Sequence, residues 1–505
     1  MAPEKGSVIT RHWLLLVAIF LCSGLLGGLA ASPAWPAPKA KAAVQKSKKA
    51  PAKKPGRAEK KTRPARRPQA PDPEKLPFPE NIQTLAGSGA VLITDHHAGR
   101  NRSRDLFALN PDKTYVPASI LKLVTVGAAL DILGPAYRFR TDFYADSGSN
   151  LWIAGRGDPF VVSEELCLIM DRLKQAGLKQ VKDIYLDTSF FEPGLILDGN
   201  NFTINPYDAY NSAFGVNFNT VNYLIDRKGQ IVECDPCTPL TPVTVDLAER
   251  NRPKKGRKNR YPREFRLNIS DSPQEAEKNS AQMVRALLEK NGLSADSRIF
   301  LGQTLPKDVR LVYSHLSTRT LEDMIKELLK HSNNFVTNQI FLTMGAEKYG
   351  APATPEKGQQ AVRDFLAKYK LPPITVVEGS GLSRLNQVTA HQMARVLGTL
   401  EPVRHLISTS SDGLVIAKTG TMSDIQTLAG YLVRPDRLEE PLSFVILLNG
   451  AYKPGTRDKI LKALKAQFLP GGETEPAPRP EVRLSRSDDL ALQQRGLFSP
   501  AESAL

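Results

Sequence analysis

Cysteine is scarce in this chain, with four in 505 residues. So few cysteines exclude the disulfide framework by which small secreted proteins make up for a limited core. Cys234 and Cys237 form a lone CDPC in a Pro-rich stretch, where we expect a small local disulfide, with two free thiols as the alternative. Cys167, within EELCLIM, has the surroundings of a core residue.

Zinc-type ligand spacing is missing too, because CDPC has neither a second Cys pair nor a His cluster near it. His96 and His97 stand together in the predicted turn DHHAGR. Two side chains are too few to hold a metal, so we expect both histidines at the surface. The sequence therefore predicts no metal and no cofactor.

One long apolar run lies near the start of the chain, WLLLVAIFLCSGLLGGLAA, with Lys5 and Arg11 before it. This is the pattern of an export signal, and Gly28 and Ala30 offer a small-x-small cleavage site. The run is also nearly long enough to span a bilayer uncleaved. Residues 1–31 are therefore predicted to be a signal peptide or a membrane anchor, and the protein is expected in the periplasm.

Positive charge is concentrated in one segment. Residues 39–75 hold 14 Lys and Arg against three acids, which accounts for 11 of the formal net charge of +16. Residues 32–78 have almost nothing to bury and are predicted to be a disordered tether. Behind an export signal, such a tether suits anionic lipids or acidic wall polymers rather than nucleic acid, or is only a solvated spacer. The Pro- and charge-rich residues 471–505 are predicted to be a disordered tail.

Residues between the tether and the tail show both strand and helix patterns. A hairpin is predicted from GAVLIT to DLFALN, followed by a helix over 118–133 that ends at a Gly-Pro breaker. From about 140 to 270, the runs LWIAG, DIYLDTSFF, TPVTVDL and FRLNI indicate a mostly β inserted region. Helical spacing returns over 273–290 and 320–331. GLVIAKTGT and LSFVILLNG then suit adjacent buried strands before a closing helix over 457–468.

Three short motifs follow one another along the chain. A Ser followed three places later by a Lys is expected by chance about once or twice in a chain this long. All three motifs in order, each on a suitable element, are much rarer. They are Ser119-Ile120-Leu121-Lys122, Ser332-Asn333-Asn334 and Lys418-Thr419-Gly420, with Thr421 next.

The residue types in these motifs suit nucleophilic catalysis. A serine hydroxyl is a poor nucleophile until a neighbour accepts its proton, and a neutral lysine one helical turn away can do so. Apolar Ile120, Leu121 and Val124 would lower the pKa of Lys122, and so would a second cation, Lys418. A serine near a helix N-terminus also presents its N–H and the positive end of the helix dipole to a developing oxyanion.

The order SxxK, SxN and KTG resembles the signature of penicillin-binding proteins and serine β-lactamases. More narrowly, PASILKLVT, SNNFVTNQI, EGSGLSRLNQVT, AKTGT and GRGDP resemble the S13 family of D-alanyl-D-alanine carboxypeptidases and endopeptidases, the PBP4-like low-molecular-mass penicillin-binding proteins. The resemblance implies an α/β (α+β) transpeptidase fold, an antiparallel sheet flanked by helices, in 79–142 and 310–470. Residues 143–309 would form inserted domains.

The resemblance also implies a role for each motif residue. Ser119 would be the acylated nucleophile, Lys122 its general base and Ser332 a proton-transfer group. The backbone N–H groups of Ser119 and Thr421 would form the oxyanion hole. The implied substrates are peptidoglycan stem peptides and cross-links, with β-lactam antibiotics as covalent inhibitors and no cofactor. The residues expected to bind the substrate are Asn334, Lys418, Thr419, Gly420 and Thr421.

The sequence leaves two alternative functions open. SNN stands where SDN is commoner, but its middle side chain has no assigned chemistry. EGSG in place of DGSG and the unusual MSDIQTLAGYL after KTGT leave the cleft rim open, and the divergent inserted region leaves open the preference between stem peptides and cross-links. A β-lactamase would differ by rapid release of the acyl group, and we see no clear deacylating glutamate motif. A non-catalytic wall-binding protein on the same scaffold would have no use for intact Ser119, Lys122 and Lys418.

Overall fold

The computed structural model of the chain describes residues 74, 76–99, 103–253 and 261–469. The predicted signal segment 1–31, nearly all of the predicted tether 32–78 and the predicted tail 471–505 lie outside the described residues. Within the described ranges, no helix is both long enough and apolar enough to cross a membrane.

The first sheet has five strands, and every neighbouring pair is antiparallel. The predicted hairpin is confirmed as β1 and β2. GLVIAKTGT and LSFVILLNG are both strands, but they are not adjacent, because a turn at 423–424 lets β12 pair with both. The strand order is β11 (Val415–Met422), β12 (Ile425–Arg434), β13 (Arg437–Asn449), β1 (Ala90–Asp95) and β2 (Arg104–Leu109), which leaves β11 at one edge.

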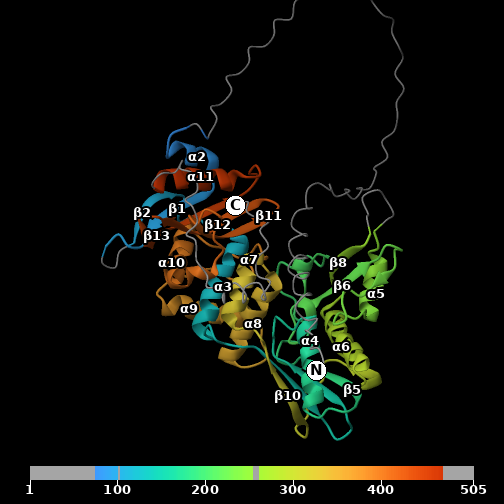
Figure 1. Cartoon of the computed structure of the whole chain (residues 1–505). Coiled ribbons are helices and arrows are strands. Elements are labelled where there is room, and N and C mark those ends of the chain that lie inside the picture. The colour runs from blue at the N-terminus through green and yellow to red at the C-terminus, as the bar shows by residue number, and fades with distance from the viewer. Residues whose placement is uncertain (1–73, 75, 100–102, 254–260, 470–505) are drawn as a thin grey trace, which may run out of the picture.

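Helices cover both faces of this sheet, because successive side chains of a strand point to opposite sides. On one face, residues such as Val91 pack against α2 (Glu80–Ala86) and α11 (Thr456–Phe468). On the other face, residues such as Ala90 pack with α10 (Ala390–Leu400) and the helices behind it. Figure 1 shows α2 and α11 together above the sheet and the other helices of this part below it. The predicted antiparallel sheet flanked by helices is present.

Two of the helices below the sheet begin at motif residues. The predicted helix over 118–133 forms as a 3₁₀ turn, η2 (Ala118–Leu121), that continues into α3 (Lys122–Ile132). α8 (Asn334–Tyr349) begins just after α7 (Leu321–His331) ends. α3 and α8 pack together, and each is buried along most of its length. α9 (Pro355–Lys368) packs against both.

The inserted region contains two further sheets, and Figure 1 shows it as a second body beside the first sheet and its helices. The larger sheet is mixed: β4 and β9 each run parallel to β5, whereas β3 is antiparallel to β4 and β10. Its order is β10 (Arg310–Leu316), β3 (Arg140–Ala145), β4 (Leu151–Gly155), β5 (Val181–Asp187) and β9 (Ser294–Phe300). The smaller sheet is β7 (Ile231–Val232), β6 (Thr220–Ile225) and β8 (Arg263–Asn268).

Three helices pack on these two sheets, so the inserted region is more helical than its sequence indicates. The predicted helix over 273–290 is confirmed as α6 (Pro273–Lys290), but α4 (Ser163–Gln175) was not expected. The run TPVTVDL is helix α5 (Pro242–Arg250) rather than a strand, because Thr241 caps the Thr244 N–H and proline occupies the first turn. β10 pairs with β3, which places 310–316 with the inserted sheet.

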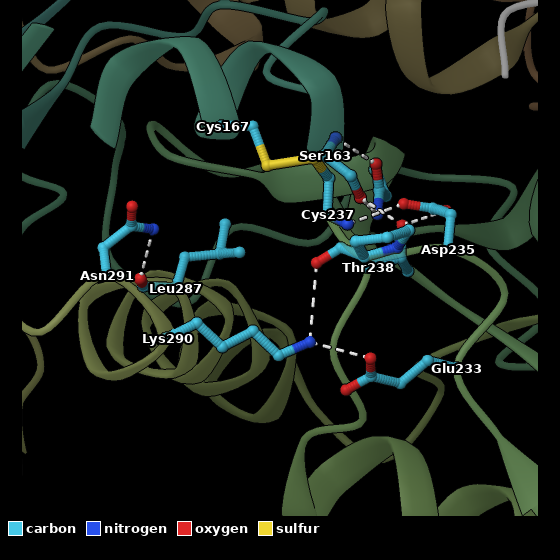
Figure 2. Close-up of a disulfide and its surroundings, with 11 residues drawn as sticks. Ser163, Cys167, Glu233, Asp235, Cys237, Thr238, Leu287, Lys290 and Asn291 are labelled. Atoms are coloured by element: carbon cyan, nitrogen blue, oxygen red, sulfur yellow. Dashed lines mark hydrogen bonds and ion pairs between the residues drawn. A yellow bond between two sulfur atoms is a disulfide. The ribbon is translucent and has the colours of Figure 1, made fainter. Parts of the chain in front are cut away.

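The local disulfide expected between Cys234 and Cys237 is wrong. Cys237 is bonded to Cys167, 70 residues away on α4 (Figure 2). Cys234 is the free thiol of the described residues. The physical reason is the turn that contains Cys237. Asp235 accepts a hydrogen bond from the Cys237 N–H at 2.8 Å, and Thr238 Oγ1 donates to Ser163 Oγ at the start of α4, so the turn is held against the helix that carries Cys167. Burial, with Glu264 and Asp235 nearby, raises the pKa of Cys234 to about 12.

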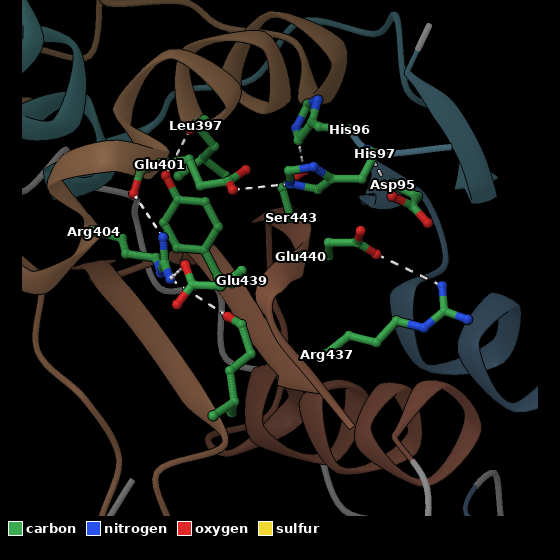
Figure 3. Close-up of polar contacts among 12 residues, drawn as sticks. Asp95, His96, His97, Leu397, Glu401, Arg404, Arg437, Glu439, Glu440 and Ser443 are labelled. Carbon is green, nitrogen blue, oxygen red and sulfur yellow. Dashed lines mark hydrogen bonds and ion pairs between the residues drawn. The ribbon is translucent and has the colours of Figure 1, made fainter. Parts of the chain in front are cut away.

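The two histidines of DHHAGR lie in different environments (Figure 3). His97 is exposed and pairs with Glu401 at 2.9 Å, as expected of a surface residue. His96 differs from the expectation: it is half-buried, its Nε2 lies 2.9 Å from Ser443 Oγ, and its ring packs against Gly398 on α10. Burial lowers the pKa of His96. Among the described residues, no group of His, Cys, Asp or Glu has the arrangement to hold a metal ion.

Candidate active site

The three motifs converge on one cleft of about 700 Å³. Ser119 lines it from η2, Ser332 and Asn334 line it from the junction of α7 and α8, and Thr421 lines it from β11. Lys122 and Lys418 are buried beside it, with 0% and 3% of their surface exposed. The structure thus brings together residues that are separated by some three hundred positions in the sequence.

Lys122 has three oxygen neighbours. Its Nζ lies 3.0 Å from Ser119 Oγ, 2.8 Å from Asn334 Oδ1 and 2.7 Å from the backbone oxygen of Ser380. Amide and carbonyl oxygens only accept hydrogen bonds. A neutral amine therefore donates its two N–H groups to Asn334 and Ser380 and turns its lone pair toward the hydroxyl of Ser119.

The surroundings favour this neutral form. Burial is the largest cause that holds the pKa of Lys122 well below its ordinary value, and Lys418 is the second, while Glu378 opposes them. These are the two influences that the sequence predicts. Burial, assisted by Arg457, also lowers the pKa of Lys418 to about 7.

The backbone before Ser119 is tightly constrained. Ala118 has a φ of 50°, in the left-handed region that residues with a side chain seldom adopt. Gly381 lies against it: a Cβ on Gly381 would be 2.0 Å from the Ala118 carbonyl oxygen. A Cβ on Gly420 would likewise be 3.0 Å from the Ser119 nitrogen. Glycine at these two positions lets two chain segments approach the nucleophile's turn.

β11 presents one backbone edge to this turn. The Ala417 N–H donates to Ser408 O at 3.0 Å, on the side away from β12. Backbone groups of a strand alternate between its two edges, so Thr419 and Thr421 face the same side as Ala417. Thr421 also lines the cleft with Ser119. Ser119 and Thr421 therefore border the same cleft, and β11 turns its outer edge toward that side.

The SNN motif lies at a helix-to-helix junction. Ser332 ends α7 with a φ of 53°, and the Asn333 side chain accepts the Val336 N–H at 3.0 Å to cap α8. Asn334 Nδ2 donates to Tyr207 O at 3.2 Å while its Oδ1 accepts from Lys122. Asn in the middle place therefore does the capping that Asp would do, which explains why SNN can replace SDN here.

Sequence reasoning missed two parts of the site. Ser380 belongs to EGSG, which the sequence indicates only as structural support near the cleft, and nothing local reveals that its carbonyl meets Lys122. Asp198, Asn201 and Tyr207 line the cleft from the inserted region. They lie in a long irregular segment without hydrophobic periodicity or a recognisable motif, so the sequence gives no signal for them.

The fold and the order of the motifs define a penicillin-binding serine peptidase. The family model of the D-Ala-D-Ala carboxypeptidase 3 (S13) family matches residues 86–251, 262–403 and 396–467, well over half of the chain. The chain belongs to this family, as its motifs predict, and is a serine-type enzyme of the D-Ala-D-Ala carboxypeptidase class.

Relatives of known name agree with this assignment. The chain is 26% identical over 432 residues to a D-alanyl-D-alanine carboxypeptidase of Actinomadura sp., covering 72% of this chain and 78% of that one. It is 26% identical over 423 residues to D-alanyl-D-alanine carboxypeptidase DacB of Haemophilus influenzae, covering 73% and 87%. The crystal structure of penicillin binding protein 4 from H. influenzae matches with a TM-score of 0.62 at 22% identity, covering 77% of this chain and 99% of that one.

Proposed function

We propose that this enzyme cleaves D-Ala-D-Ala-type bonds of peptidoglycan peptides through an acyl-enzyme on Ser119. The observation that carries the proposal is the buried Lys122, whose Nζ lies 3.0 Å from Ser119 Oγ and has two acceptors for its own hydrogens. Such an amine can take the proton of a serine hydroxyl.

In the acylation step, Ser119 Oγ attacks the carbonyl carbon of the penultimate D-Ala, and its proton passes to Lys122. The oxygen that becomes negative accepts from the N–H groups of Ser119 and Thr421. The C–N bond then breaks, and the departing D-Ala nitrogen receives the proton through Lys122 and Ser332. Water attacks the acyl-enzyme in the second half, with the same groups acting in reverse.

Substrate binding is assigned to the other motif residues. Lys418 and Thr419 bind the terminal carboxylate of the peptide, and Asn334 binds a backbone amide. Gly420 lets β11, the strand along which the peptide would lie, come close to the turn of Ser119, because a side chain here would meet that turn. β-Lactams, which also carry a carboxylate beside a reactive carbonyl, would acylate Ser119 in the same way.

The enzyme is proposed to act in the periplasm, where its substrate is found, after export by residues 1–31. The basic residues 39–75 would hold it near anionic lipid or wall polymers. Cell fractionation of the full chain, compared with a chain whose 39–75 lysines and arginines are replaced by glutamine, measures this contribution. An unchanged distribution would leave the segment as a spacer.

Acylation is tested by incubating the protein with a fluorescent penicillin and locating the adduct by mass spectrometry. The adduct is expected on Ser119 and absent from Ser119→Ala. No adduct, or one undiminished in Ser119→Ala, contradicts the proposal, and rapid penicillin turnover would favour a β-lactamase instead.

Digestion of peptidoglycan fragments then separates the two peptidase activities. Loss of one D-Ala from stem peptides indicates a carboxypeptidase, and conversion of cross-linked dimers to monomers indicates an endopeptidase. Binding to wall fragments without either product would indicate a non-catalytic protein.

A further inference from the structure

Glu378 is a fully buried carboxylate that accepts an unusual number of hydrogen bonds. Each oxygen has three donors, and most of them belong to the segment that follows it in the chain. Oε2 accepts from Ser380 N at 2.8 Å, Ser380 Oγ at 2.6 Å and Asn338 Nδ2 at 3.0 Å. Oε1 accepts from Gly381 N at 2.7 Å, Ser383 N at 3.2 Å and Asn386 Nδ2 at 2.9 Å.

These bonds fold residues 379–383 around the carboxylate, and this loop meets the active site at two points. The Ser380 carbonyl accepts from Lys122 Nζ at 2.7 Å. Gly381 lies directly on the carbonyl of Ala118, the residue before the nucleophile. The six donors to Glu378 include neither Lys122 nor Ala118, so Glu378 would act on the active site through the loop. Hydrogen bonds to a charged acceptor are about twice as strong as neutral ones, which suits a fixed loop.

The position of the Ser380 carbonyl matters because Lys122 must direct its lone pair. A neutral amine with one acceptor can rotate, whereas two fixed acceptors, Asn334 Oδ1 and Ser380 O, define where both hydrogens go. The lone pair then points to Ser119. Loss of the Ser380 acceptor would leave the amine free to donate a hydrogen to the hydroxyl that it should deprotonate.

We infer that Glu378 is a positioning residue of the acylation reaction: its carboxylate holds the 379–383 loop so that the Ser380 carbonyl orients Lys122 toward Ser119. This inference rests on the proposed roles of Ser119 and Lys122. The charged groups that act on Lys122 are Lys418 from β11 and Glu378 from the loop. Glu378 therefore also moderates how far burial and Lys418 depress the pKa of Lys122.

The test compares Glu378→Gln with Glu378→Asp in the full chain. Glutamine keeps the shape but turns one acceptor oxygen into an NH₂ group that faces three donors. Aspartate keeps the charge and both acceptors on a side chain one methylene shorter, and DGSG is the sequence that EGSG replaces. Asp146→Asn is the matched control, because Asp146 accepts four hydrogen bonds, from Gly148, Asn150 and Trp152, in a turn of the inserted region.

The measured quantity is the rate constant of Ser119 acylation by a fluorescent penicillin as a function of pH. We expect Glu378→Gln to lower the maximal rate by about 10- to 100-fold, the cost of a displaced catalytic group. The acid limb of its pH–rate profile, where protonation of Lys122 stops acylation, should also move to lower pH. The reason is that no carboxylate then favours the charged form of Lys122. Glu378→Asp should restore the wild-type limb and part of the rate, and Asp146→Asn should leave both unchanged.

An acid limb that stays in place in Glu378→Gln, or a rate loss shared by Asp146→Asn at equal thermal stability, would overturn the inference. If Glu378→Gln does not fold, the rate of Glu378→Asp decides: a carboxylate one methylene shorter should hold the loop less well and slow acylation, and a full wild-type rate would overturn the inference as well. Failure of the proposed function would be distinguishable from this. In that case the wild-type protein would form no penicillin adduct, or Ser119→Ala would still form one.

Discussion

At the scale of single residues, the site depends on a lysine buried without a carboxylate in contact. The three oxygens around Lys122 Nζ belong to a hydroxyl, a side-chain amide and a backbone carbonyl. Hydrogen bonds to neutral groups contribute about 1 kcal/mol each, whereas burying a charge costs several kcal/mol. The balance favours the neutral amine, which is the state that a general base needs.

Lys418 should set an alkaline limit on activity against peptides. Burial lowers its pKa to about 7, so the free enzyme loses the ammonium proposed to bind the substrate carboxylate as the pH rises through that value. We expect kcat/KM for a stem peptide with a free terminal carboxylate to fall above about pH 7. The same peptide with an amidated C-terminus should not show this fall in kcat/KM. If both peptides show the fall, a group other than Lys418 causes it.

At the scale of elements, the edge strand β11 must lie almost in contact with the 3₁₀ turn η2. Gly420 is where they meet, since a Cβ there would be 2.2 Å from Thr427 Oγ1 and 2.9 Å from Pro117 O. Pro117 O also accepts a hydrogen bond from Thr427 Oγ1 at 2.7 Å, so the space is already occupied. The strand can be this close only without a side chain.

Gly420→Ala is therefore expected to push β11 away from Ser119 and to separate the N–H groups of Ser119 and Thr421, which are proposed to form the oxyanion hole. A displacement near 1 Å costs about 100-fold in rate. Acylation by a fluorescent penicillin should fall by about that factor, while the thermal unfolding temperature changes little, because an edge strand can shift outward. Ser119→Ala is the negative control, in which no acylation is expected. A wild-type acylation rate in Gly420→Ala would contradict the prediction, because β11 and η2 could then accommodate the added methyl group without displacing the site.

The cap of α8 should matter for both stability and the site. Asn333 accepts the Val336 N–H at 3.0 Å, and the next residue, Asn334, bonds Lys122. Asn333→Ala should cost about 1 kcal/mol of unfolding free energy, measured by denaturant titration, and also slow acylation. Asn333→Asp keeps an acceptor at a helix N-terminus, where negative charge is favourable, and should match or exceed wild type in stability. Equal stability of Asn333→Ala would contradict the cap.

At the scale of the whole molecule, the sequence predicts the elements near the motifs better than the inserted region. Strong periodicity located the helices at 118–133, 273–290 and 320–331, because each has a single buried stripe or a clear breaker. The run TPVTVDL misled because its β-branched residues favour strands, while the cap at Thr241 and the following proline decide the structure. Tertiary pairing, such as β10 with β3, has no local signal.

The candidate site shows the same division. Ser119, Lys122, Ser332, Asn334 and the β11 residues could be named from the sequence because each belongs to a short motif. The contacts of Glu378 and Ser380 could not, because they depend on a loop that folds back on its own carboxylate. The cleft residues of the inserted region depend on how two bodies of the protein pack, which no local pattern encodes.

The disulfide between Cys167 and Cys237 joins α4 to the segment after β7, entirely within the inserted region. Its sequence separation of 70 residues predicts a contribution of about 4 kcal/mol, mainly by restricting the unfolded chain. Replacing both cysteines by serine should therefore lower the stability of the inserted region in denaturant by roughly that amount. Cys234→Ser should not.

Acylation of Ser119 in the native state should survive this double substitution, because the helices and sheet that carry the motifs have their own apolar core, distinct from that of α4 and α6. Peptide mapping without reduction should yield a Cys167–Cys237 linked pair from wild type. A Cys234–Cys237 pair instead would contradict the structure. Loss of acylation together with the loss of stability would mean that the cleft residues from the inserted region, such as Tyr207, are held in place only while that region is intact.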